Sequence, residues 1–329
     1  MNRLIVVFSV LLLTTAGGLA AESLSFEYRP ISKADLDRVQ KDWRNRDLRA
    51  RNIKVVHEED RDGFELLVVQ HDISSRAHFG AIFVPDVDDL SNVPVVVLPD
   101  HLEQWNPTID IEQNIEKYQS YEPLTGFIKI LPGFRGRFVD YKDRGWFSRG
   151  DFCDAFDGPA DDSIAMLNVA EELFPEVNFE EVLVWGGSRG GTTALLMAVR
   201  DARVNTVIAL GAPVDFYRES WQVPGSDQYR CQFFDEKSDE QSRQRILASS
   251  PLFFEPHENL EAVSLHHDAG DEVVLVWNVH EVADHLESHS VDVTKYIYPT
   301  EGHGAMVAEE SFWENMKTDI SEFLRRTKK

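Results

Sequence analysis

Residues 181–200 read EVLVWGGSRGGTTALLMAVR, and this stretch decides the fold. The run from Val182 to Trp185 is short, apolar and ended by glycines, which is typical of a buried strand. The run from Thr192 to Val199 is almost wholly apolar and contains neither Gly nor Pro, which favours a buried helix. The residues between the two runs, 186–190, therefore have to turn sharply from a strand into a helix.

A serine stands at the centre of this turn. Gly186 and Gly190 allow the two backbones to pass closely, so that Ser188 can be held in a strained conformation with its hydroxyl exposed. The turn also places Ser188 at a helix N-terminus, where free N–H groups and the helix dipole favour developing negative charge. A strand, Gly-x-Ser-x-Gly and a helix together make the context of a nucleophile elbow. The alternative, a flexible Gly/Ser turn, is disfavoured by the strand and the helix that flank it.

Strand and helix patterns alternate along the chain after residue 93. The expected strands are 94–98, 127–131, 181–185, 204–210, 262–266 and 294–298, and the expected helices are 109–121, 162–174, 189–200, 273–288 and 312–326. Such alternation predicts an α/β fold with a mostly parallel central sheet and helices on both of its faces.

Three strand patterns and one helix pattern come before this alternation. The strand patterns are 53–56, 64–70 and 78–84. The helix pattern begins at Ser32 with a capping signal and ends near Arg51. We therefore expect an N-terminal helical extension at 21–52 and a single domain at 53–329, because no linker divides the alternating region.

The N-terminus has the features of a secretory signal peptide. Arg3 supplies a positive start, Leu4 to Leu13 an apolar segment, and Gly18-Leu19-Ala20 an end of the small-x-small type. The apolar segment is shorter than the roughly 20 residues of a membrane span. We expect residues 1–20 to be cleaved and the protein to be secreted or periplasmic, without stable membrane insertion. A retained N-terminal anchor is the alternative.

The formal net charge of −24 argues against nucleic acid and anionic membrane surfaces as partners. The chain has two cysteines, Cys153 and Cys231, and in an exported protein they are able to form a disulfide. The sequence alone does not show whether their Cα atoms come close enough. A catalytic cysteine is disfavoured, because neither residue lies in a glycine-rich turn. The oligomeric state stays open.

Residues 212–250 interrupt the alternation with a polar and aromatic insert, expected to be small and helical. The insert follows the strand after the serine turn, at the carboxyl edge of the sheet, where ligands bind in folds of this class. We therefore expect a lid or a substrate pocket here, with Tyr217 and Trp221 as candidate substrate contacts. A helical hairpin packed on the flank of the sheet is the alternative.

A serine hydroxyl is a poor nucleophile at neutral pH and needs a neighbouring base, which in turn needs an acid to orient it. His303 follows the last expected strand between two glycines, and Asp271 follows the strand before it. The order Ser188, Asp271, His303 is the order of the hydrolase elbow architecture. Asp268 is a competing candidate for the acid. A metal site at His266-His267-Asp268 is disfavoured, because adjacent side chains of a strand face opposite ways.

From about residue 53 to its end, the chain resembles an α/β-hydrolase, and within that superfamily the catalytic domain of prolyl oligopeptidases and the dienelactone-hydrolase-like esterases. The stretches that carry the likeness are WGGSRGG (185–191), LPGFRGRF (131–138), SSPLFF (249–254), LHHDAGDEVV (265–274) and PTEGHG (299–304). The resemblance implies the α/β-hydrolase fold, with Ser188 as nucleophile, Asp271 as acid and His303 as base. It favours Asp271 over Asp268, because the acid in this family precedes a short apolar pair. No counterpart of the family's β-propeller is expected before residue 53.

The sequence departs from the family pattern at two places. Arg189 stands where the large dipeptidyl peptidases usually have Tyr, and Pro99-Asp100-His101 stands where His-Gly is usual. The oxyanion hole is expected from the backbone N–H of Arg189 and one N–H near Asp100 or His101. Arg189 is also a candidate for substrate recognition, as is Arg135. Salt bridges to nearby acids are the alternative role for Arg135.

These features predict an exported serine hydrolase that cleaves a carboxylic ester through an acyl-enzyme. The substrate is expected to be a small-molecule ester or peptide, and the reaction requires no metal and no organic cofactor. A peptidase or aminoacyl hydrolase that uses the same three residues is one alternative, although acidic residues that would grip a free amine are not evident. A non-catalytic binding protein with a hydrolase fold is the other.

Overall fold

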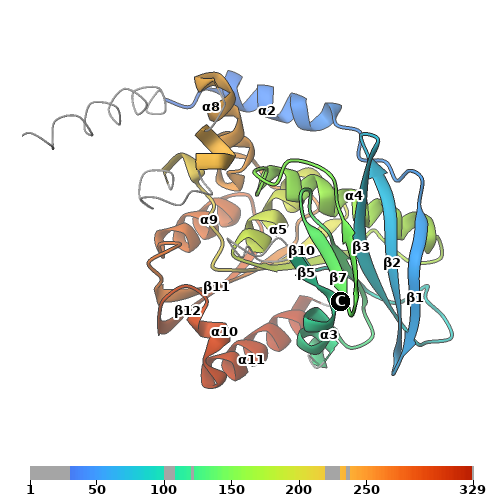
Figure 1. Cartoon of the computed structure of the whole chain (residues 1–329). Coiled ribbons are helices and arrows are strands. Elements are labelled where there is room, and N and C mark those ends of the chain that lie inside the picture. Colours follow the sequence, from blue (N-terminus) through green and yellow to red (C-terminus); the bar gives the residue numbers. More distant parts are fainter. Residues whose placement is uncertain (1–29, 100–107, 120–121, 219–229, 235–237, 328–329) are drawn as a thin grey trace, which may run out of the picture.

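A nine-stranded sheet forms the centre of the computed structural model (Figure 1). The structure describes residues 30–99, 108–119, 122–218, 230–234 and 238–327. In spatial order the strands are β1 (Lys54–Arg61), β2 (Phe64–Ile73), β3 (Arg76–Pro85), β6 (Ile128–Pro132), β4 (Val95–Val97), β9 (Val182–Gly187), β10 (Val204–Leu210), β11 (Ala262–Gly270) and β12 (Asp292–Glu301). The strands from β6 to β12 pair in parallel, whereas β1, β2 and β3 form an antiparallel extension beside β6.

Helices cover both faces of this sheet. They are α2 (Lys33–Asn45), α3 (Ile111–Gln119), α4 (Asp157–Leu173), α5 (Arg189–Arg200), α8 (Asp239–Ala248), α9 (Trp277–Ser288), α10 (Ala305–Ala308) and α11 (Glu310–Thr327). Short helical turns lie at Glu122–Leu124, Arg230–Phe234 and Pro251–Phe253. The mostly parallel sheet with helices on both faces is the α/β-hydrolase fold, and it confirms the predicted fold class.

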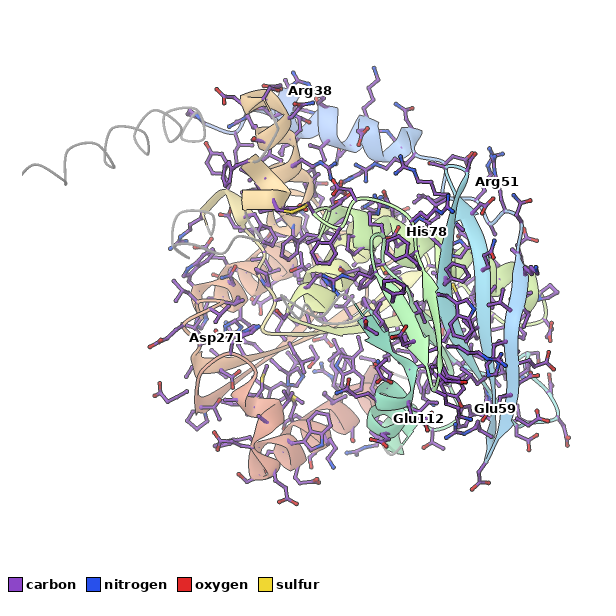
Figure 2. The ribbon with its side chains drawn as sticks, viewed as in Figure 1. Arg38, Arg51, Glu59, His78, Glu112 and Asp271 are labelled. Carbon is purple, nitrogen blue, oxygen red and sulfur yellow. A yellow bond between two sulfur atoms is a disulfide. The ribbon has the colours of Figure 1, made fainter. Side chains whose placement is uncertain are left out.

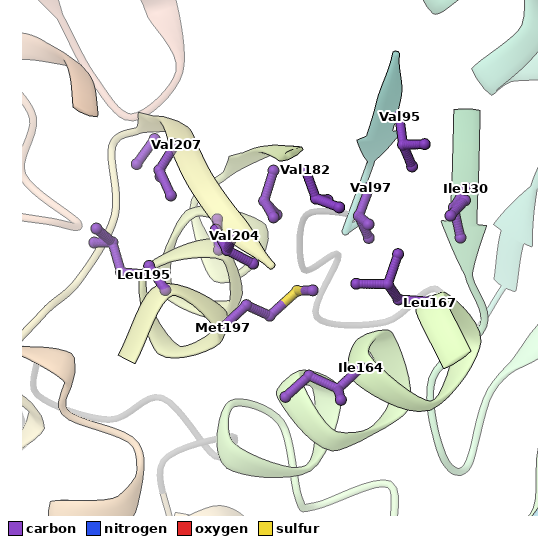
Figure 3. Packing of buried hydrophobic residues seen from close by; sticks show 14 of the residues in the cluster. Val95, Val97, Ile130, Ile164, Leu167, Val182, Leu195, Met197, Val204 and Val207 are labelled. Carbon is purple, nitrogen blue, oxygen red and sulfur yellow. The ribbon is translucent and has the colours of Figure 1, made fainter. Parts of the chain in front are cut away.

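Side chains of β9 alternate between two cores, as expected for a central strand buried on both faces. Val182 and Val184 belong to the core formed with α4, α5 and α9, part of which is seen in Figure 3. Leu183 and Trp185 face the opposite way, into the core formed with α11. The serine turn at the end of β9 is therefore fixed from both sides of the sheet.

A second, three-stranded sheet was not predicted from the sequence. It consists of β5 (Thr108–Asp110), β7 (Phe138–Tyr141) and β8 (Arg144–Phe147) in the order β5-β7-β8. The helix predicted over 109–121 accordingly begins at Ile111, because the preceding residues pair with β7. Such short strands carry too few residues for a clear alternation, and their pairing is settled only by the folded chain.

The N-terminal helix begins where it was predicted, but it ends earlier. Ser32 and Asp35 form the capping box that the sequence indicated. The helix ends at Asn45 instead of near Arg51, since Arg46 is already extended. The guanidinium of Arg46 donates to Asp157 Oδ2 at 2.7 Å, a contact that ties this end of α2 to the start of α4. The extension is thus fastened to the domain.

The insert is fastened to the rest of the molecule in two ways. Cys153, before α4, and Cys231, in the insert, form a disulfide with a Cα–Cα distance of 5.3 Å, which resolves the question that the sequence left open. Arg243 of α8 donates to Asp35 of α2 at 2.9 Å, and the guanidinium is fully buried. The insert therefore packs against the N-terminal extension, and its remaining residues, 219–229 and 235–237, lie outside the described part.

Within the described residues, no helix combines the length and the apolar character needed to span a membrane. The signal peptide predicted at residues 1–20 lies outside this part of the chain. Cleavage of that segment therefore stays a prediction. The same holds for the boundaries of the extension and of the domain at 53–329.

Buried histidines make the fold sensitive to acid. Burial, together with the neighbouring ring of His78, lowers the pKa of His71 from 6.5 to about 4. Between these two pH values the unfolded chain binds a proton that the folded protein excludes, so stability falls as the pH falls. The wild type should therefore lose unfolding free energy as the pH falls from roughly 7 to 5. We expect His71→Gln to make this loss smaller by about 1–2 kcal/mol.

This prediction is checked by urea denaturation of the wild type and the variant at both pH values. His280→Gln, the same change at an exposed position, is the matched control and should leave the pH dependence as it is in the wild type. Equal acid sensitivity of the His71→Gln variant and the wild type would contradict the assignment. Measuring the difference between two pH values removes any cost of the substitution that does not depend on pH.

Candidate active site

The turn between β9 and α5 holds its serine in a strained conformation. Ser188 is the N-cap of α5 and has φ 50° and ψ −118°. A Cβ added to Gly186 would lie 2.2 Å from the carbonyl carbon of Gly190, and one added to Gly191 would lie 2.8 Å from the Cβ of Ala212. Any larger side chain at these positions would separate the strand from the helix. Gly186 is therefore required by the close approach, as the sequence indicated, and Gly191 is a second such glycine, which was not predicted.

Two side chains from later loops reach this serine. Ser188 Oγ and His303 Nε2 are 2.9 Å apart, and His303 Nδ1 and Asp271 Oδ2 are 2.7 Å apart. The three residues follow β9, β12 and β11, whose carboxyl ends meet at one edge because the strands are parallel. The structure therefore brings together the three residues that the sequence singled out.

The carboxylate of Asp271 is fully buried and bonded on both oxygens. Oδ2 faces His303, and Oδ1 accepts from the backbone N–H groups of Val273 at 2.9 Å and Val274 at 2.8 Å. Burial acts to raise the pKa of Asp271, but the hydrogen bond and charge of His303 and the two N–H groups lower it below its ordinary value. Asp271 is therefore ionised at neutral pH, and an ionised carboxylate only accepts.

The protonation of His303 follows from this arrangement. Because Asp271 only accepts, Nδ1 of the ring carries the proton and donates to it. In the neutral form of the ring, Nε2 then has a lone pair that accepts from the hydroxyl of Ser188. About a quarter of the His303 side chain is exposed, so the ring is accessible from outside while its acid partner is not. This geometry is that of a base ready to take a proton from the serine.

Glycines surround the ring of His303. Gly302 and Gly304 on either side of it have φ 98° and 79°, in the left-handed region that glycine tolerates best. Gly211, directly after β10, has φ 54°, and a Cβ there would lie 3.4 Å from Cε1 of His303. Gly211 was not predicted from the sequence, although a glycine directly after a strand next to the serine turn was a usable signal.

Asp268, the competing candidate for the acid, does not contact His303. Its carboxylate accepts from Thr300, Gly304 and Met306 and is fully buried. The structure therefore places Asp271, and not Asp268, against the imidazole of His303. The ring of His266, two residues before Asp268, contacts Ser264 and Tyr298.

The other candidate residues lie in different surroundings. Arg189 is 1% exposed and its guanidinium lies over the ring of Phe134, while its backbone N–H belongs to the first residue of α5. The hydroxyl of Tyr217 accepts from Arg243 at 3.4 Å. Asp100, His101 and Trp221 lie outside the described residues. Their expected parts in the oxyanion hole and in substrate binding stay predictions.

Arg135 is held in a cluster of carboxylates. Its guanidinium donates to Asp162 at 2.9 Å and to Asp154 at 2.8 Å, and it lies 3.4 Å from Asp161. These are the salt bridges that the sequence left open as the alternative role for Arg135. A contact between this residue and a substrate carboxylate stays a prediction.

A cavity of about 920 Å³ lies between α2, α8 and the start of β3. Arg38, His78 and Arg135 are among the residues that line it, and none of the three side chains around the serine turn is. In Figure 2, Asp271 lies well away from Arg38 and His78. We therefore do not assign this cavity to the chemistry at Ser188.

A strained serine between strand and helix, with a histidine and a buried aspartate on later loops of the same sheet edge, defines a serine hydrolase of the α/β-hydrolase class. Residues 141–328, more than half of the chain, match the model of the prolyl oligopeptidase family. The chain therefore belongs to the prolyl oligopeptidase family. Among curated proteins, none matches it by sequence.

Several solved structures share the fold at low sequence identity. Acetyl xylan esterase 1 from Thermoanaerobacterium sp. JW/SL YS485 is 14% identical with a TM-score of 0.62, and the match covers 91% of this chain and 98% of the esterase. The acylaminoacyl peptidase of Pyrococcus horikoshii is 14% identical with a TM-score of 0.56, over 83% of this chain and 49% of the peptidase. Dipeptidyl peptidase 4 of Porphyromonas gingivalis is 17% identical with a TM-score of 0.55, and the match covers 83% of this chain and 36% of the peptidase.

The close approach at the serine turn makes a stability prediction. Gly186→Ala inserts a methyl group 2.2 Å from the backbone of Gly190, and we expect it to lower the free energy of unfolding by about 1–3 kcal/mol. Gly187→Ala is the matched control, because a Cβ there meets nothing closer than Leu210 at 3.9 Å. Urea denaturation of both variants measures the difference. Equal stability of the two variants would contradict this account of the turn.

Proposed function

We propose that this protein is an exported serine hydrolase that cleaves a carboxylic ester through an acyl-enzyme, with Ser188, His303 and Asp271 as its catalytic triad. One observation carries the proposal: a continuous chain of hydrogen bonds from the serine hydroxyl through the imidazole to a buried, ionised carboxylate. A strained serine conformation has a cost that surrounding structure must offset, and such strain clusters at reactive sites.

The geometry suggests the following reaction. His303 Nε2 takes the proton from Ser188 Oγ as the oxygen attacks the ester carbonyl, and Asp271 stabilises the imidazolium and holds the ring tautomer. The tetrahedral intermediate collapses as His303 gives the proton to the leaving alcohol, which forms the acyl-enzyme. Water then loses its proton to His303 and attacks the acyl carbonyl. Collapse of the second intermediate returns the proton to Ser188 and releases the acid.

The oxyanion of each intermediate needs hydrogen-bond donors. The backbone N–H of Arg189 follows the nucleophile at the start of α5, where the helix dipole also favours negative charge. We assign the second donor to the loop after β4, at Asp100 or His101, because that loop supplies it in this architecture. The proposed pair would stabilise the developing charge without any metal ion.

An ester is favoured over a peptide as substrate by the extent of structural similarity. The match to the acetyl xylan esterase spans nearly the whole length of both chains, whereas the two peptidases match over about half of their length or less. Membership in a family named for peptidases supports the alternative, a peptidase or aminoacyl hydrolase with the same triad. Both activities proceed through an acyl-enzyme, so the substrate decides between them.

Export is supported by two features. Residues 1–20 have the pattern of a signal peptide, and Cys153 and Cys231 form a disulfide. Disulfides persist in oxidising compartments and are rare in the cytosol. A secreted or periplasmic location is consistent with both features.

The proposal predicts the effect of removing the nucleophile. Ser188→Ala should lower turnover of p-nitrophenyl acetate by at least about 10³-fold and abolish labelling by a fluorophosphonate, because among the described residues no other hydroxyl is hydrogen-bonded to His303. The melting temperature should not fall, since the substitution removes only the hydroxyl and leaves Cβ and the backbone of the turn in place. Ser91→Ala, at an exposed position, is the control for the same chemical change.

Undiminished turnover by the Ser188→Ala variant would refute the mechanism. A panel of short-chain esters and short peptides, assayed with the wild type, separates the two substrate classes. Faster cleavage of the esters supports the proposal, and cleavage of peptides with only marginal turnover of esters would replace it by the peptidase alternative. Failure of the wild type to react with the fluorophosphonate would favour a binding protein.

A further inference from the structure

Asp268 lies at the end of β11, close to the catalytic histidine but not in contact with it. It is fully buried, and three donors converge on its carboxylate. Oδ1 accepts from the hydroxyl of Thr300 and from the backbone N–H of Met306 at 2.7 Å, and Oδ2 accepts from the backbone N–H of Gly304 at 2.9 Å. All three donors belong to residues within three positions of His303: Thr300 is the last but one residue of β12, and Gly304 and Met306 follow the histidine.

Burying a carboxylate costs several kcal/mol of folding free energy unless the carboxylate is hydrogen-bonded. Loss of its donors would therefore be unfavourable, so the carboxylate holds them tightly. Hydrogen bonds to an ionised acceptor are roughly twice as strong as neutral ones. Asp268 itself is fixed by the sheet, because it pairs with Tyr298 of the neighbouring strand β12. The carboxylate is therefore a rigid point to which the loop after β12 is attached.

The strand register brings Thr300 into this contact. Asp268 pairs with Tyr298, and Gly270 pairs with Glu301. The step between the two pairs is therefore two residues in β11 but three residues in β12. The extra residue in β12 is a bulge, and bulges redirect side chains next to active sites. The backbone N–H of Gly302 also donates to Gly270 at 3.0 Å, which ties the other side of the loop to β11.

The loop needs such an anchor. His303 lies between two glycines in left-handed conformations, and glycine restricts the backbone least of all residues. The ring must nevertheless lie within hydrogen-bond distance of both Ser188 and Asp271. A misplacement of about 1 Å is enough to cost a catalytic group about 10²-fold in rate. Asp271 orients the ring but does not bind the backbone of the loop.

We propose that Asp268 is a positioning residue, which fixes the backbone on the C-terminal side of His303 so that its ring spans the distance from Asp271 to Ser188. The two carboxylates therefore have different roles. Asp271, in the loop after β11, orients the imidazole, whereas Asp268, in β11, places the loop that carries it. This inference rests on the proposed role of His303 as the base.

Asp268→Asn is the direct test. The amide keeps one acceptor oxygen but turns an NH₂ group toward one of the two backbone N–H donors, which is a repulsive contact next to His303. We expect kcat for p-nitrophenyl acetate to fall about 10²-fold with KM changed less than about threefold, because the substitution acts through His303 and does not touch the substrate. The rate of fluorophosphonate labelling should fall by the same factor.

A double-mutant cycle separates positioning from a loss of folded protein. In a His303→Ala background, Asp268→Asn should cause no further loss of the residual labelling rate, whereas a smaller folded fraction would lower the rate equally in both backgrounds. Ser264→Ala is the matched control: it removes a buried hydrogen bond from the same strand, to His266, and leaves the His303 loop intact. Its kcat should stay within about twofold of the wild type.

The outcomes are distinct. Wild-type kcat in the Asp268→Asn variant, or equal losses in both backgrounds, would overturn the positioning role and leave the triad in place. Wild-type turnover in the His303→Ala variant would overturn the proposed mechanism and this inference with it. Should Asp268→Asn fail to fold, Thr300→Val removes one of the three donors and keeps the carboxylate. An unchanged kcat in that variant would then overturn the proposal, and a fall of about threefold or more would support it.

Discussion

The close contact between the backbones of Gly186 and Gly190 is the constraint on which the rest of the structure depends. Because Gly186 has no side chain, α5 starts directly over the end of β9, and Ser188 is left at the tip of the turn with a positive φ. The strain is sustained by the packing on both sides of β9, where Val184 and Trp185 point into opposite cores. A serine on a less confined turn would relax and lose its defined direction.

The parallel order of the strands brings His303 and Asp271 to the same edge of the sheet as Ser188. From β9 to β12 the strands lie side by side in chain order, so every loop that follows a strand opens at the same edge. Ser188 and His303 are 115 residues apart in sequence, yet only 2.9 Å separate Oγ from Nε2. Asp271 is placed by the same rule, and the N–H groups of the second and third residues after it donate to its carboxylate. The helix α9 begins at Trp277, four residues later than the sequence indicated.

Local pattern was enough to predict the alternation of strands and helices, the serine turn and the fold class, since these depend on hydrophobic periodicity and on glycine. What it did not reveal depends on contacts between distant residues. The strand at 108–110 is defined only by pairing with β7, and the disulfide only by the distance between two loops. The choice between Asp268 and Asp271 was made by family resemblance. The structure adds the physical reason, because one carboxylate faces the imidazole and the other faces backbone N–H groups.

The attachment of α2 bears on the order in which the chain assembles. Trp43 Nε1 donates to Asp157, which lies 114 residues further along the sequence, and Arg46 donates to Asp157 and Asp161. The residues of α2 are made before those of α4 and have no docking surface until α4 has emerged and packed on the sheet, and closing so long a loop has an entropic cost. The first helix of the described chain thus reaches its final position only after α4 has done so.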